Sequence, residues 1–133
     1  MPQPTTDFTG SDAVIAALTD LIFATRIRST AQALGIPAII VPSLEELKQS
    51  LDRFAAGLVL IDLNGFGEDA IRAVTMARQH PSRPRVLAYA AHVDRQLADS
   101  AKQNGAHEVL PRSRFHAELP RILKPEHREA GAD

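Results

Sequence analysis

The chain has 133 residues, the usual size of one domain, and this length is enough to bury a hydrophobic core. Its 15 basic and 16 acidic residues leave a net charge of -1, which argues against a dedicated nucleic-acid or anionic-membrane binder. There is no cysteine, so disulfides, thiol catalysis and cysteine-based zinc sites are excluded.

The two ends of the sequence are polar and contain proline and glycine. The first residues lack the basic start and apolar run of a signal peptide, and no stretch approaches the ~20 apolar residues of a membrane span. We predict that residues 1–11 and 125–133 are disordered tails and that residues 12–124 form one domain. A soluble, cytoplasmic protein is expected.

The domain begins with a predicted strand, helix and strand. Residues 13–18 (AVIAAL) form a short apolar run that is typical of a strand covered on both faces, as in a parallel sheet. Apolar side chains then recur every three or four positions over residues 23–34, which predicts a helix, and Gly35 suits its C-terminal end. A second apolar run covers residues 36–41 (IPAIIV).

The middle of the domain repeats this alternation. Ser43 and Glu46 form a capping box at the start of a helix that extends to Phe54. A third apolar run follows at residues 58–63 (LVLIDL), and a third helix is predicted from residue 70 to a stop before Pro81.

The last part of the domain holds two more strands and two more helices. The fourth apolar run covers residues 85–90 (RVLAYA), and the fourth helical pattern ends at residues 104–105 (NG). The fifth run is short, at residues 108–110. Ser113 is a candidate cap for a fifth helix, but Pro120 lies inside that helix and predicts that it is short or broken.

Five alternations of strand and helix predict an α/β fold. The arrangement that fits is a three-layer, doubly wound, five-stranded parallel sheet of order 2-1-3-4-5, joined by right-handed crossovers. In such a sheet ligands bind beyond the carboxyl ends of the strands, where the strand order reverses. Here that point lies between the first and third strands.

Two acidic residues follow these two strands, and we expect them to share one cleft. They are Asp20 after the first strand and Asp62 at the end of the third. Mg²⁺ is typically held by one or two carboxylates together with waters and phosphate oxygens. Arg112, after the fifth strand, would add a positive charge, and a carboxylate in such a group can accept a phosphoryl group.

The sequence resembles the receiver domain of bacterial two-component response regulators, a CheY-like, flavodoxin-like fold, from about residue 12 to about residue 123. The segments LTDLIFATRIR, LVLIDLNG, AAHVD and NGAHEVLPRS carry the resemblance. It implies that Asp62 accepts phosphate from a histidine kinase. It also implies a Mg²⁺ site formed by Asp20, Asp62 and the backbone carbonyl of Asn64, with Arg112 in place of the family's lysine.

Besides Arg112, four positions depart from the pattern of that family. Thr19 stands where the first of two adjacent acids is usual, and Ala90 where a Thr or Ser hydroxyl reaches the phosphoryl group during switching. Val109 replaces the switching aromatic residue, and Ser113 replaces a frequent proline. We therefore expect weak Mg²⁺ binding and impaired or absent phospho-switching.

The arginine at position 112 leaves two hypotheses open. A guanidinium pairs bidentately with a carboxylate, so Arg112 could hold Asp62 in a standing ion pair that makes phosphate unnecessary. Alternatively, Arg112 stabilises the charge of a phosphoryl group on Asp62. His107 and His116 lack the spacing of metal ligands, and we interpret both as surface residues.

The sequence thus predicts a stand-alone signalling module and no enzyme, since no segment long enough for an output domain follows the fifth helix. Its expected partner is a protein, either a histidine kinase or a downstream signalling protein, and neither nucleic acid nor membrane is expected. Contact, including a possible homodimer, is expected on the face of the fourth helix, fifth strand and fifth helix, with Arg95, Asp99, Lys102 and Arg114.

Two other functions were weighed. The main alternative is a functional receiver phosphorylated at Asp62. A more distant one is binding of a small molecule in the same cleft, although the GxGxxG and GxxxxGK[ST] loops are absent and the loop after the first strand lacks glycine.

Overall fold

The structure is a computed structural model that describes residues 13–91 and 94–125. The predicted tails, apart from Pro125, lie outside the described residues, as do Asp12 and the loop residue His92. Of the described helices, none is long and apolar enough to cross a lipid bilayer.

Five parallel strands form one sheet, and their order is the predicted one, β2-β1-β3-β4-β5. The strands are β1 (Val14–Ala17), β2 (Ala38–Val41), β3 (Leu58–Asp62), β4 (Arg85–Ala90) and β5 (Glu108–Pro111). The helices are α1 (Leu21–Ala33), α2 (Leu44–Arg53), α3 (Ala70–Gln79), α4 (Arg95–Gln103), α5 (Arg112–Ala117) and α6 (Leu119–Leu123), with a 3₁₀ turn η2 (Gly67–Asp69) before α3.

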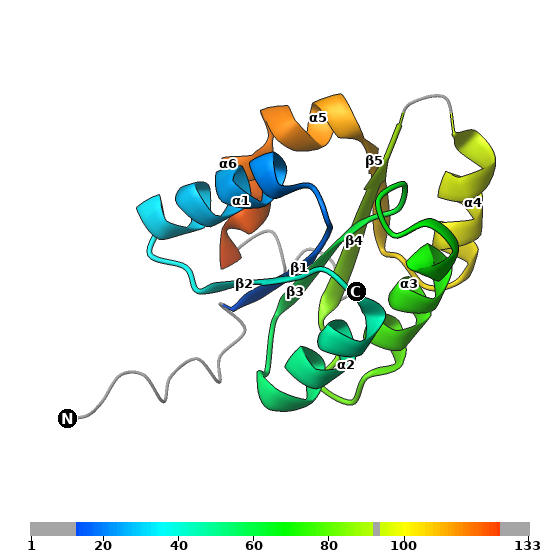
Figure 1. The fold of residues 1–133 in the computed structure, drawn as a ribbon, viewed down its shortest axis with the longest axis horizontal. Coiled ribbons are helices and arrows are strands. Elements are labelled where there is room, and N and C mark those ends of the chain that lie inside the picture. Colours follow the sequence, from blue (N-terminus) through cyan, green and yellow to red (C-terminus); the bar gives the residue numbers. More distant parts are fainter. Residues whose placement is uncertain (1–12, 92–93, 126–133) are drawn as a thin grey trace.

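The helices cover the sheet on both faces, which is why the strands are apolar except at some of their ends (Figure 1). One buried cluster lies under α2, α3 and α4, and the other lies under α1, α5 and α6. Because successive side chains of a strand point to opposite faces, neighbouring residues divide between the clusters. In β4, Tyr89 packs in the α1 cluster and Ala90 in the α3 cluster.

The local signals at the helix ends are confirmed. The Ser43 hydroxyl accepts a hydrogen bond from the Glu46 backbone N–H at 3.2 Å, as a capping box requires. Gly35 follows α1 with a φ of 72°, in the left-handed region that favours glycine.

The predicted break in the last helix is confirmed, but the predicted cap is wrong. Two short helices replace one, and Pro120 lies in the first turn of α6, where its missing N–H costs nothing. Pro111, not Ser113, occupies the N-cap position of α5, and Ser113 is already inside the helix. Pro111 ends β5 in an extended conformation (φ -61°, ψ 147°), so the helix begins directly at Arg112.

Candidate functional site

Asp62 is a buried acid at the carboxyl end of β3, with 4% of its surface exposed. Its Oδ1 accepts a hydrogen bond from the Gly65 backbone N–H at 3.1 Å. A Cβ atom at Gly65 would lie only 2.5 Å from Asp62 Oδ2, so the loop after β3 closes over the carboxylate only because residue 65 is glycine. The sequence alone gave no reason to connect Gly65 with the acid.

The loop after β1 reaches the same place. Thr19 Oγ1 lies 3.5 Å from the position of that Gly65 Cβ, which puts Thr19 beside the Asp62 carboxylate. Asp20, the next residue, is exposed and caps α1, with its Oδ1 accepting from the Phe23 N–H at 3.1 Å. The helix start thereby compensates part of the Asp20 charge.

Three groups after β1 and β3 carry oxygen atoms of the type that bind magnesium. The carboxylates of Asp20 and Asp62 and the backbone carbonyl of Asn64 are the oxygen ligands that Mg²⁺ prefers. Within residues 13–91 and 94–125 no cluster of three or more acidic or histidine side chains gathers around a metal position. Any ion would therefore keep several of its waters.

The Asn64 side chain makes two hydrogen bonds, although only its backbone carbonyl was expected to have a role in the site. Its side-chain Oδ1 accepts from the Ala91 N–H at 2.7 Å, and its Nδ2 donates to Asp94 Oδ2 at 3.3 Å. Asp94 is the N-cap of α4 and accepts from the Leu97 N–H through Oδ1. Asn64 thus ties the loop after β3 to the end of β4 and to the start of α4.

Arg112 is the first residue of α5 and is exposed. Among the described residues no ion pair within 4 Å joins it to Asp62, so the anticipated standing ion pair is not formed. The guanidinium is nevertheless near enough to the site to act electrostatically on Tyr89.

Tyr89 is a residue that the sequence reasoning missed. It is the Cα partner of Asp62 in the β3–β4 ladder, and only 1% of its surface is exposed. Its ring stacks on Phe115 of α5 with centroids 4.1 Å apart and meets Phe23 of α1 edge-on at 5.5 Å. A single tyrosine in an apolar strand was the available signal, but it points to this site only once the register is known.

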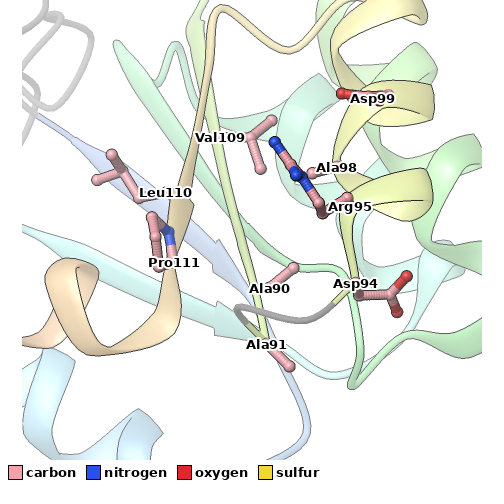
Figure 2. A pocket seen from close by; sticks show the side chains of 9 residues that line it. All are labelled: Ala90, Ala91, Asp94, Arg95, Ala98, Asp99, Val109, Leu110 and Pro111. Carbon is pink, nitrogen blue, oxygen red and sulfur yellow. The ribbon is translucent and has the colours of Figure 1, made fainter.

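A cavity of about 320 Å³ opens on the other face, between α4 and the ends of β4 and β5 (Figure 2). Ala90 and Val109, two of the positions that depart from the family pattern, contribute small side chains to it. Figure 2 shows Arg95 reaching from α4 toward Val109, with Asp99 one turn further along the helix. The complete lining is Ala90, Ala91, Asp94, Arg95, Ala98, Asp99, Val109, Leu110 and Pro111.

The two histidines interpreted as surface residues are in fact partly buried. His107 Nδ1 accepts from the Val86 N–H at 2.9 Å, and the His116 ring stacks on Phe23 with centroids 3.5 Å apart. Burial lowers the pKa of both imidazoles, and arginines nearby lower each further, Arg78 for His107 and Arg26 for His116.

Comparison with known proteins gives matches by structure alone, since no family model and no curated protein matches the sequence. The receiver domain of a sensor histidine kinase from Pseudomonas aeruginosa, with magnesium in its active site cleft, is similar over 86% of this chain and 95% of its own, with TM-score 0.71 and 21% identity. An orphan response regulator of H. pylori is similar over 93% and 98%, with TM-score 0.71 and 18% identity.

A CheY-like receiver domain from Methanospirillum hungatei is similar over 89% of this chain and 96% of its own, with TM-score 0.72 and 10% identity. The chain therefore has the fold of response regulator receiver domains.

Proposed function

We propose that this protein is a receiver-like signalling module that acts by contact with another protein and whose α4 face is held in place without a phosphoryl group. The observation that carries this proposal is the side-chain bridge from Asn64 to Ala91 and Asp94. In the family that the sequence resembles, a hydroxyl at the end of β4 moves toward the phosphoryl group. Here Ala90 has no hydroxyl, and the Asn64 side chain already holds Ala91 and Asp94 through hydrogen bonds.

The expected contact surface is the face formed by α4, β5 and α5. It carries exposed charges of both signs, among them Arg95, Asp99 and Lys102, and the cavity between α4 and β5 opens on it (Figure 2). An apolar recess with a charged rim suits the side chain of a partner protein. We expect that partner to be a histidine kinase or a downstream signalling protein, and the same face offers a route to a homodimer.

The test is amide NMR of α4 with and without Mg²⁺ and acetyl phosphate. We expect the resonances of residues 95–103 to stay in place in the wild type, because Asn64 holds the start of the helix. In Asn64→Ala they should shift or broaden without any phosphodonor. Large phosphodonor-dependent shifts of α4 in the wild type, lost in Asp62→Asn, would overturn the proposal.

We propose a second candidate function, in which Asp62 is a phosphoacceptor, and the environment of Asp62 supports it. In that reaction a carboxylate oxygen of Asp62 attacks the phosphorus of acetyl phosphate, the bond from phosphorus to the acetyl oxygen breaks, and acetate leaves with the electron pair. Burial and the hydrogen bond from Gly65 fix the carboxylate for such an attack. The expected result is a mass gain of one phosphoryl group, dependent on Mg²⁺ and absent in Asp62→Asn.

A further inference from the structure

The Tyr89 hydroxyl is an anomaly in the described part of the molecule. The atom is buried, and it has no hydrogen-bond partner there. Nearly all buried polar atoms in proteins are paired with protein groups or ordered water. A buried hydroxyl beside a reactive acid therefore calls for a partner that binds at that place.

The β3–β4 register aims Tyr89 at the same side of the sheet as Asp62. The two residues are Cα partners in parallel strands, so their side chains leave the sheet on the same face. Leu60 and Leu87, one pair earlier in the ladder, lie together in the buried cluster of that face. Ala90, where the family has its hydroxyl, packs in the cluster of the opposite face.

Two aromatic neighbours fix the direction of the hydroxyl. Phe115 stacks on the Tyr89 ring with an interplanar angle of 16°, and Phe23 meets it edge-on at 76°. Rotation of the ring about χ1 would break both contacts, each of a kind that stabilises aromatic pairs. The hydroxyl is consequently a fixed donor and needs no reorganisation to act.

The hydroxyl keeps its proton at every physiological pH. Burial raises the pKa of Tyr89 far above its ordinary value, and the carboxylates of Asp62 and Asp20 raise that pKa further, whereas Arg112 lowers it. Tyr89 can therefore donate a hydrogen bond but cannot act as a base. Asp62, Asp20 and Arg112 are thus the charged groups that act on the pKa of this hydroxyl.

We propose that the Tyr89 hydroxyl donates a hydrogen bond to the phosphoryl group carried by Asp62, in place of the hydroxyl that Ala90 lacks. This inference rests on the second function above, in which Asp62 is a phosphoacceptor. The added phosphoryl oxygens would give the hydroxyl the acceptor that it lacks, and Arg112 would approach the same negative charge from the start of α5. Phosphorylation of Asp62 would then act through Tyr89 on Phe115 and α5, on the face of the sheet opposite to the one that carries the cavity.

Thr19 is the competing source of a hydroxyl at this edge of the sheet. Its Oγ1 is also near Asp62, because a Cβ atom at Gly65 would lie 3.5 Å from Thr19 Oγ1 and 2.5 Å from Asp62 Oδ2. Thr19 is exposed, however, so water can satisfy its hydroxyl. Thr19 therefore provides the matched control, since Thr19→Val removes a hydroxyl next to the acid but outside the buried cluster.

The experiment measures binding of beryllium trifluoride, which mimics a phosphoryl group on a carboxylate, in the presence of Mg²⁺. Backbone amide shifts around residue 62 measure the affinity in every variant. Because the chain contains one tyrosine and no tryptophan, the tyrosine ring resonances report on Tyr89 alone in the proteins that keep it. The proteins compared are the wild type, Tyr89→Phe, Thr19→Val and Asp62→Asn. Thermal unfolding without ligand checks that Tyr89→Phe is folded, and its melting temperature should equal or exceed that of the wild type, because an unpaired buried hydroxyl is removed.

We expect the wild type to bind the mimic with a shift of the Tyr89 ring resonances. Tyr89→Phe should bind about tenfold more weakly or worse, and Thr19→Val should bind within about twofold of the wild type. Equal binding by the wild type and Tyr89→Phe would overturn the role of Tyr89 and leave the phosphoacceptor function intact. No binding by the wild type at saturating Mg²⁺ would overturn the phosphoacceptor function and, with it, the role of Tyr89.

Discussion

The two faces of the sheet differ most at the end of β4, where consecutive residues enter opposite environments. Tyr89 lies in a tightly packed aromatic group with Phe23 and Phe115, and its hydroxyl lacks a partner in the described part of the chain. Ala90 lies at the wall of an open cavity of about 320 Å³. On the packed face, the buried Tyr89 hydroxyl is without a hydrogen-bond partner among the described residues. On the open face, the small side chains of Ala90 and Val109 leave the cavity unfilled.

Under the proposal above, the packed side of the molecule responds to the acid. Tyr89 is on that side, where its ring stacks on Phe115 of α5. The start of α4 is instead held by Asn64. The four predictions that follow test the contrast between the packed and open faces, beginning with the largest expected effect.

Removing the stacked ring should strongly destabilise the packed face. Phe115 is fully buried, so Phe115→Ala is expected to lower the free energy of unfolding by ~3–5 kcal/mol, as measured by urea denaturation. Phe54→Ala is a suitable control, because Phe54 is only half-buried at the end of α2. A loss at Phe115 no larger than that at Phe54 would mean that the two faces are not packed differently.

A methyl group at position 65 should disturb the acid itself. The added Cβ of Gly65→Ala would lie 2.5 Å from Asp62 Oδ2, so we expect a loss of ~1–3 kcal/mol in unfolding free energy and loss of beryllium trifluoride binding.

The control for this change is Gly67→Ala. Gly67 has a φ of 57° and nothing within 4 Å of an added Cβ, so this variant should lose stability through backbone strain but keep the mimic bound. Retained binding in Gly65→Ala would show that the close approach to Asp62 does not position the carboxylate.

Filling the cavity should cost little. Val109→Phe places a ring in the open space under α4, and we expect the unfolding free energy to change by less than about 1 kcal/mol. Leu60→Phe, which enlarges a buried side chain on the packed face, should cost ~1–3 kcal/mol. Equal costs for the two substitutions would remove the distinction between the faces.

Acidification should have the smallest effect. The folded-state pKa values of His107 and His116 lie below the ordinary value of 6.5, so the unfolded chain takes up protons below about pH 6.5 that the folded chain does not. Stability should therefore fall as the pH drops through this range and be flat above about pH 7.

The size of this effect is limited, because both imidazoles are partly exposed to solvent. His116→Gln removes the contribution of the packed face, and His107→Asn keeps an acceptor for the Val86 N–H while removing the other titrating ring. Urea denaturation from pH 5 to pH 8 measures each slope. A slope unchanged in both variants would contradict this assignment.

The fold was predictable because its signals are local. The apolar run before Asp62 and the capping box at Ser43 each define an element from a few adjacent residues. The strand order was then predicted from the usual arrangement of five-stranded doubly wound sheets. The break at Pro120 follows from the chemistry of one residue. Only the start of α5 was misplaced, because Pro111 could be read as strand or as helix entry.

The site was predictable only in part, because it depends on register. The sequence places Asp62 at the correct edge of the sheet, but it does not show that Tyr89 rather than Ala90 is its ladder partner. The side-chain bridge of Asn64 requires the loop after β3 and the end of β4 to meet in space. The cavity likewise depends on how far α4 stands from β5.

Glu118 lies between the two short helices α5 and α6, where it ends one and begins the other. Arg114 and Arg121 both pair with Glu118, one from each side, and α6 packs against α1 while α5 packs against β4 and β5 (Figure 1). One carboxylate therefore links the two short helices at the surface, while Phe115 of α5 and Leu123 of α6 are buried in the same cluster beneath them. A Glu118→Gln substitution would weaken both of these links at once.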